Sequence, residues 1–83
     1  MLTELKETIS LMESDNYKER FKAEYCQLVI RYERLVNMLE KWDKGELPFE
    51  PTCPRSTYNI QVRAMADYLA IMEARAVMEN IKF

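Results

Sequence analysis

Apolar and polar positions alternate with a helical period over most of the chain. The clearest run lies between residues 21 and 42, where apolar side chains recur at alternating spacings of four and three residues. Its members are Phe21, Tyr25, Leu28, Tyr32, Leu35, Leu39 and Trp42. On a helix these positions form one stripe with the seven-residue period of coiled-coil packing. The pattern predicts a long helix at about residues 15–43 that needs a partner along this stripe.

Side chains at both ends of this run fit helix boundaries. Asp15 or Ser14 can cap the start, since a side-chain oxygen there accepts a hydrogen bond from a free backbone N–H. Lys41 suits the negative C-terminal end of the helix dipole, and Gly45 followed by Pro48 stops the helix.

A shorter apolar repeat precedes the long helix. Leu2, Leu5, Ile9 and Met12 recur at spacings of three and four, which predicts a short amphipathic helix at about residues 3–13, starting near Thr3. The sequence leaves two positions open for this element. It either covers one end of the rest of the fold or swaps onto a neighbouring protomer.

The segment 43–54 contains all three prolines and the single glycine. Prolines at these intervals prevent a helix and favour an extended path, so we expect a stiff connection. We expect Leu47 and Phe49 to fix this connection to the helices.

A second long helix is predicted at about residues 56–80, with Ser56 or Thr57 as its cap. Its expected stripe is Tyr58, Gln61, Met65, Tyr68, Met72, Arg75 and Glu79, flanked by Val62, Leu69 and Ala76. Two long helices joined by about a dozen residues should lie antiparallel. The sequence therefore predicts an all-α fold in which a short N-terminal helix accompanies a long antiparallel αα-hairpin.

The 83 residues suffice for one small domain, which we place at residues 1–83. A hairpin has no third wall, so part of its aromatic and methionine surface should remain uncovered. We therefore expect the chain to assemble with itself into an oligomeric helical bundle.

Charge and cysteine usage exclude several classes of partner. The net charge of −2 argues against binding to duplex nucleic acid through a basic face. Cys26 and Cys53 lack the spacing of a zinc site and the chain has no histidine, so we expect reduced thiols and no metal. No run resembles a signal peptide or a membrane span, which leads us to expect a cytoplasmic protein without membrane contact.

Signatures of enzymes are missing from the sequence. It has no histidine for general base chemistry, no glycine-rich phosphate loop and no nucleophile elbow, so we expect no catalytic residue and no cofactor. Gln61 and Arg75 interrupt the second apolar stripe. Either Arg75 pairs with a carboxylate across the bundle while Gln61 fixes the register, or both face a cavity for a polar ligand.

Two clusters combine cations, hydroxyl groups and an aromatic ring at a predicted helix start. They are Arg55, Ser56, Thr57 and Tyr58 in the second long helix, and Tyr17, Lys18, Arg20 and Lys22 in the first. Free N–H groups at a helix start, an arginine and an aromatic ring suit a phosphate and a base. Ordinary helix capping and solvated lysines are the alternative interpretation of both. In an antiparallel hairpin the clusters lie at opposite ends, so they can form one site only across a subunit interface.

A resemblance to a known group rests on residues 17–25 (YKERFKAEY), 49–54 (FEPTCP) and 65–69 (MADYL), with Gln61 and residues 73–75 (EAR). These stretches are similar to a family of small phage and prophage proteins of gut bacteria that includes the crAss-phage-related group. The resemblance covers nearly the whole chain. It implies a phage-encoded protein acting in a bacterial host cell.

The chain also resembles, more loosely, the helical hairpin proteins with which phages sequester the nucleotide signals of CBASS and Thoeris immunity. That resemblance implies an anti-defence protein that binds a cyclic oligonucleotide or an ADP-ribose derivative without cleaving it. The rival hypothesis is a protein-binding inhibitor or adaptor of a host defence protein, similar to an anti-CRISPR protein. A sponge needs enclosed basic and aromatic pockets, whereas an inhibitor needs one open patch.

Overall fold

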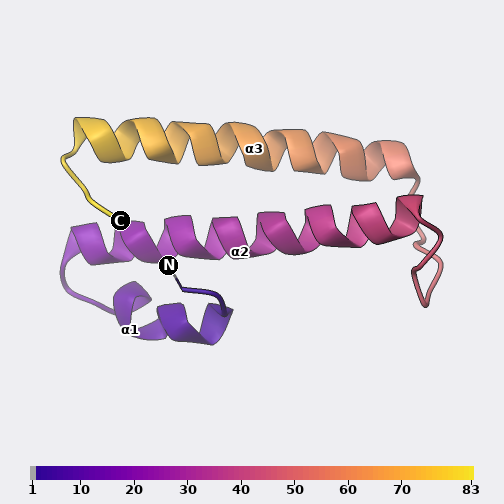
Figure 1. The fold of residues 1–83 in the computed structure, drawn as a ribbon. Helices are drawn as coiled ribbons and strands as arrows, with labels where there is room; N and C mark the ends of the chain where they lie inside the picture. The colour runs from indigo at the N-terminus through magenta and orange to yellow at the C-terminus, as the bar shows by residue number, and fades with distance from the viewer. Residues whose placement is uncertain (1) are drawn as a thin grey trace.

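The computed structural model describes residues 2–83 and consists of two long helices and one short N-terminal helical element (Figure 1). The short element is a 3₁₀ turn, η1 (Leu5–Thr8), continued by the α-helical turn α1 (Ile9–Met12). The long helices are α2 (Tyr17–Asp43) and α3 (Arg55–Met78). This confirms the predicted all-α fold with two long helices packed together.

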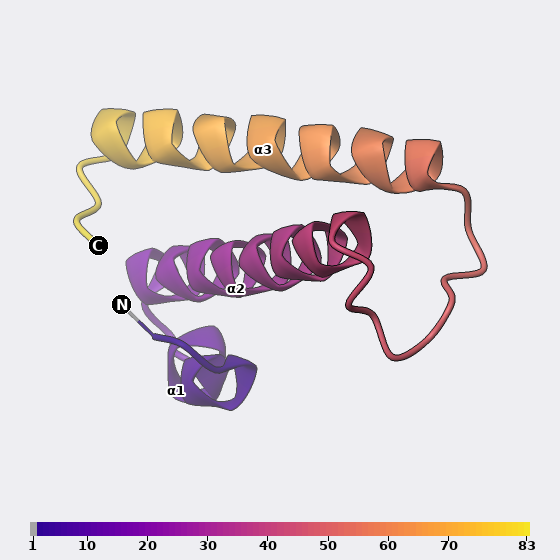
Figure 2. The same cartoon turned by 45° about the vertical axis from the view of Figure 1, so that its right-hand side comes forward.

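Helix α2 is the central element of the fold. Helix α3 runs antiparallel along one side of it, and η1 and α1 pack on the opposite side (Figures 1 and 2). Its predicted stripe faces α3. The core between the two long helices consists of Phe21, Tyr25, Leu28, Met72 and Ala76, together with Ile81 from the C-terminal tail.

The apolar face of α3 differs from the predicted stripe by a rotation of the helix. Gln61 is exposed and Tyr68 is 42% exposed, although both were expected in the seam. The residues that turn toward α2 are Tyr58, Val62, Met65, Leu69, Met72 and Ala76. Three of these residues belong to the predicted stripe, and the other three, Val62, Leu69 and Ala76, belong to its predicted apolar flank. The amide of Gln61 is left in water, where it needs no protein partner.

The start of α2 is capped by a residue that the sequence analysis did not select. Asn16 accepts a hydrogen bond from the backbone N–H of Lys18 through its Oδ1, over 2.9 Å. The expected caps were Ser14 and Asp15. The helix begins at Tyr17, so the residue directly before it, Asn16, holds the N-cap position. The Ser14 hydroxyl does not cap the helix and donates to the carboxylate of Glu19 over 2.9 Å.

Both ends of α3 are fixed by the backbone. Pro54 holds the N-cap position without a side-chain cap, so the predicted capping by Ser56 or Thr57 is wrong; the helix begins before these residues, at Arg55. At the other end Asn80 adopts a left-handed φ of 56°, and the N–H of Ile81 donates to the carbonyl of Ala76 over 2.8 Å. This turn ends the helix at Met78 and sends the tail back toward α2.

The N-terminal element packs on α2 of the same chain. Thr8 is 1% exposed; its hydroxyl donates to the carbonyl of Leu5 over 2.7 Å and accepts from Gln27 Nε2 over 2.8 Å. The element begins at Leu5 and not near Thr3, because the Glu7 carboxylate accepts the N–H of Glu4 and sets that boundary.

The connection from α2 to α3 descends on the same side of α2 as α1 before it rises to α3 (Figures 1 and 2). Gly45 turns the chain with a φ of 71°. Leu47 is half-buried as expected, whereas Phe49 is 56% exposed. Within residues 2–83, no helix has both the length and the apolar character that crossing a bilayer requires.

Candidate functional site

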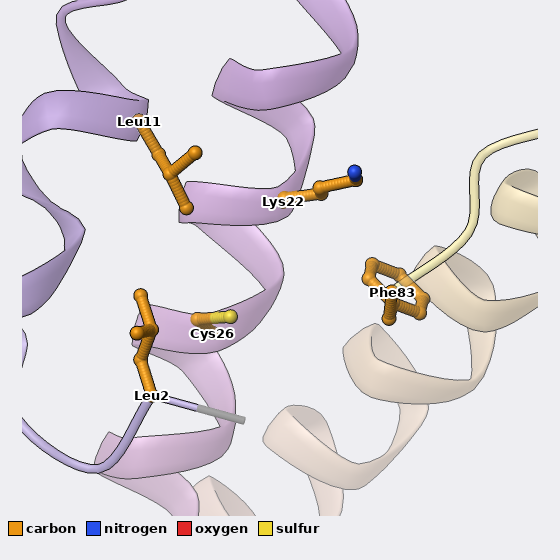
Figure 3. Close-up of a pocket in the computed structure, with 5 residues that line it drawn as sticks. All are labelled: Leu2, Leu11, Lys22, Cys26 and Phe83. Atoms are coloured by element: carbon orange, nitrogen blue, oxygen red, sulfur yellow. The ribbon is translucent and has the colours of Figure 1, made fainter.

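A cavity lies where Leu2 and the C-terminal tail meet α2. It has a volume of about 490 Å³ and is lined by Leu2, Leu11, Lys22, Cys26 and Phe83. Figure 3 shows Leu2 and Leu11 on one side of the two α2 residues and Phe83 on the other. We call this cavity the terminal pocket.

The C-terminal tail builds one wall of the terminal pocket. Ile81 is buried against the core and anchors the tail after the turn at Asn80. The ring of Phe83 then stacks on Tyr25, with centroids 4.0 Å apart, and on Phe21, with centroids 6.1 Å apart. Because 54% of Phe83 stays exposed, the stack ends in a ring with accessible surface.

The lining of the terminal pocket is mainly apolar with one cation. Three ion pairs form among residues 2–83, and Lys22 takes part in none of them. Cys26 is a free thiol and is 7% exposed. In the described part of the chain, no group of three or more His, Cys, Asp and Glu residues is arranged to hold a metal ion. The pocket therefore suits a flat apolar group that carries negative charge.

The predicted cluster at the start of α2 joins that helix to the end of α3. The hydroxyl of Tyr17 donates to Glu79 Oε1 over 2.5 Å and accepts from Arg75 Nη2 over 2.9 Å. Lys18 Nζ donates to the carbonyl of Asn80 over 3.1 Å. A third member of the cluster, Arg20, donates through Nη1 to the Ser14 carbonyl over 2.7 Å.

Opposite charges in this network stabilise one another. The hydrogen bond from Tyr17 and the nearby Arg75 guanidinium lower the pKa of Glu79. The Glu79 carboxylate in turn raises the pKa of Tyr17 and that of Arg75. The guanidinium of Arg75 pairs with Glu79 one turn along the same helix over 3.1 Å and lies 5.0 Å from the ring centroid of Phe21. The expectation that Arg75 pairs with a carboxylate across the bundle is therefore corrected, since its carboxylate partner Glu79 is the C-cap residue of its own helix.

The predicted cluster at the start of α3 is centred on Arg55. Its guanidinium binds both carboxylate oxygens of Asp43, over 3.1 and 3.4 Å, and also donates to Asn59. It lies 5.8 Å from the ring centroid of Trp42, and the ring of Tyr58 meets Trp42 edge to face at 5.8 Å. Arg55 thus ties the start of α3 to the end of α2.

The remaining members of the second cluster, Ser56 and Thr57, are exposed. The two clusters occupy opposite ends of the hairpin, because Lys18 reaches the end of α3 whereas Arg55 reaches the end of α2. The structure therefore does not bring the two clusters together within one chain.

The terminal pocket contains residues that the sequence did not indicate as site residues. Lys22 belongs to the cluster predicted at the start of the first long helix, whereas Leu2, Leu11, Cys26 and Phe83 were not selected. Of these four, Phe83 carries a usable signal, since it is an aromatic residue two positions after an apolar one in the segment that follows the helix. The fold of the tail, which depends on the left-handed turn at Asn80, cannot be read from that spacing.

Comparison with known proteins gives one match. No curated protein and no solved structure matches the chain. The sequence model of the Sequestin family matches residues 15–78. This range includes both long helices and the connection between them. The match spans most of the chain, and the protein belongs to the Sequestin family.

Proposed function

We propose that this chain binds and sequesters a nucleotide-type immune signal without cleaving it. The family name suggests sequestration. The observation that carries the ligand class is the terminal pocket, in which the ring of Phe83 and the cation of Lys22 line one cavity of about 490 Å³. This volume falls in the range of pockets that enclose small organic ligands.

The chemistry of the terminal pocket matches the two parts of a nucleotide. A base would stack on Phe83 and extend the existing stack with Tyr25, and such stacking contributes roughly 1–3 kcal/mol per base. Lys22 would donate charge-assisted hydrogen bonds to a phosphate. Leu2 and Leu11 would exclude water from the other face of the base. Candidate ligands are cyclic oligonucleotides and ADP-ribose derivatives, the signals of CBASS and Thoeris immunity.

The proposal includes self-association of a phage-encoded protein in the cytoplasm of the bacterial host. It is supported by the outer side of α3, where Ile60, Ile71, Val77 and Met78 are between 58% and 83% exposed. In an oligomer the clusters around Arg20 and Arg55 from different copies can meet. They would then contribute to binding the ligand, as expected from the sequence.

Calorimetry with a panel of cyclic dinucleotides, cyclic trinucleotides and ADP-ribose isomers tests this function. We expect one ligand class to bind the wild type and to be recovered chemically intact after the protein is denatured. Lys22→Ala should weaken binding about tenfold or more, because charge-assisted hydrogen bonds contribute roughly 1.5–3 kcal/mol. Lys44→Ala is the matched control, since this exposed lysine follows the far end of α2.

The two predicted clusters are tested in the same assay with Arg20→Ala and Arg55→Ala. Undiminished affinity in both variants would reject a role for these clusters. Recovery of a cleaved ligand would reject sequestration.

A second candidate function is inhibition of a host defence protein by direct binding. It is favoured by the same exposed apolar face of α3, because an open apolar patch is what a protein partner covers. Under this alternative no nucleotide binds, while Ile71→Glu abolishes protection of the phage in infected cells without changing the helix content. Protection that survives Ile71→Glu would reject this use of the α3 face.

A further inference from the structure

The face of α2 that carries η1 and α1 continues beyond them as a hollowed surface. Two adjoining cavities of about 330 Å³ each lie along it and share Arg34 and Asn37. The cavity on the side of the connection is lined in addition by Met38, Lys41 and Phe49, with Leu47 and Pro48 beside them. We call this surface the basic trough.

The position of the basic trough follows from the short length of the N-terminal element. Gln27 of α2 donates a hydrogen bond to Thr8 of the N-terminal element. Ile30, one turn further along α2, is buried near the point where this element stops covering the helix. Arg34, Asn37 and Lys41 follow Ile30 at spacings of four, three and four, so they lie on the same helix face. The connection descends on this side of α2 (Figure 1) and closes the far end.

Neither cation of the trough is neutralised by a carboxylate, which is also true of Arg20, Arg31 and Arg63 among residues 2–83. Arg55 and Arg75 each pair with a carboxylate, whereas neither Arg34 nor Lys41 takes part in an ion pair in the part of the chain that the structure describes. Seven residues separate them, which is about 10 Å along a helix. An anion between them would relieve the repulsion of two like charges on one face.

Charge is not uniform along the trough. Glu33 is the one carboxylate among the residues lining the two cavities, and it belongs to the cavity next to Thr3. A phosphate is therefore favoured toward Lys41 and away from Glu33. The amide of Asn37, which is shared by both cavities, can donate and accept hydrogen bonds at the middle of the trough.

An exposed aromatic ring stands at the Lys41 end. Phe49 is 56% exposed, and prolines at positions 48 and 51 restrict the backbone on both sides of it. A ring held in this way offers a stacking surface at small entropic cost.

We propose that the basic trough binds a nucleoside diphosphate, with its base stacked on Phe49 and its two phosphates between Lys41 and Arg34. The site shares no residue with the terminal pocket apart from Leu2, which lines its far cavity. Binding here therefore adds a second site to the proposed function and does not depend on it.

Calorimetry with ADP at low salt tests the site. We expect Arg34→Ala, Lys41→Ala and Phe49→Ala each to weaken ADP binding about tenfold or more. The matched controls are Arg63→Ala and Lys44→Ala, both at exposed positions outside the trough, and they should leave the affinity within about twofold. Circular dichroism of each variant confirms that the fold is intact.

Partial ligands identify the two halves of the site. Pyrophosphate should lose affinity with Arg34→Ala and keep it with Phe49→Ala, while adenosine should show the reverse. Absence of ADP binding at millimolar concentration would overturn the proposal, as would an equal loss of affinity in the control variants. If Lys22→Ala loses ADP binding while the three trough variants keep the wild-type affinity, ADP binds in the terminal pocket and the proposed site is overturned. Equal binding of an acidic peptide of the same charge would reject the nucleotide assignment.

Discussion

The ring of Phe83 lies nearly parallel to the ring of Tyr25, with centroids 4.0 Å apart and planes inclined by 19°. These residues stand 58 positions apart in the sequence, so the tail of the chain takes part in the tertiary structure. Ile81 is buried beside them at 6% exposure. The tail therefore stabilises the hairpin and forms the wall of the terminal pocket at the same time.

Replacing Phe83 by alanine should lower both stability and ligand binding. The aromatic pair contributes about 0.5–1.5 kcal/mol beyond the area that it buries, which corresponds to a decrease in Tm of several degrees for a chain of this size. Urea unfolding measures the change. Lys82→Ala, at the exposed neighbouring position, is the control, and equal stability of the two variants would contradict the stacking contribution.

Two methionines of α3 should respond in opposite ways to the same substitution. Met72 is 0% exposed and lies in the core, so Met72→Ala should reduce the free energy of unfolding by about 2–5 kcal/mol. Met78 is 80% exposed in the single chain, and Met78→Ala should change the free energy of unfolding of the monomer, at high dilution, by less than about 0.5 kcal/mol. Similar losses in both variants, measured by chemical denaturation, would show that the rotation of α3 is assigned incorrectly.

Stability should fall at alkaline pH because of Tyr25. Burial and the hydrogen bond that its hydroxyl donates to Glu73 over 2.7 Å raise the pKa of Tyr25 to about 12. The folded state therefore holds the phenolic proton more tightly than the unfolded state, whose pKa is near 10. This contribution is fully present below about pH 10 and is lost as the pH rises through about 12.

Thermal unfolding of the wild type and of Tyr25→Phe over this pH range measures the effect. The variant has no phenol to titrate at position 25, so its stability should decrease less steeply. Tyr17, Tyr58 and Tyr68 are present in both proteins and provide the common background. Identical slopes would mean that the phenol of Tyr25 is not protected by folding.

The fold could be predicted from the sequence because α2 carries one dominant apolar stripe. Phe21, Tyr25, Leu28 and Leu39 are buried as that stripe requires. Helix α3 is apolar on several sides. The spacing of its apolar residues therefore did not decide whether the face containing Gln61 or the face containing Val62 packs on α2. The choice was made by packing against α2, which is a tertiary effect that the period of one helix does not contain.

The candidate site was less predictable for a related reason. The sequence shows that Arg55 is a cation but not that Asp43, at the end of the other long helix, neutralises it. It also does not show that the tail returns to α2, or that η1 and α1 leave the surface of α2 around Arg34 uncovered. The availability of a cation for a ligand depends on such long-range contacts, whereas the presence of a cluster at a helix start is local.

Tyr17→Phe separates a structural role of the first cluster from a role in binding. The substitution keeps the ring for stacking on a base but removes the hydroxyl that joins Glu79 and Arg75. If the network is structural, the Tm should decrease while the affinity for the nucleotide stays the same. A variant with unchanged Tm and weakened binding would instead support the hydroxyl as a ligand contact.

Self-association should depend on the outer side of α3. Ile60 and Ile71 are 72% and 58% exposed there, and Ile71→Glu would place a charge in any interface formed by this face, where a buried charge without a partner is strongly unfavourable. Sedimentation should therefore show an oligomer for the wild type and a shift toward the 9.9 kDa monomer for the variant, with equal helix content by circular dichroism. Lys44→Ala, an exposed substitution outside α3, is the control and should sediment like the wild type. A wild type that sediments as a monomer at micromolar concentration would contradict self-association altogether. An oligomer that persists in Ile71→Glu would move the interface away from α3 and leave this apolar face available to a different protein.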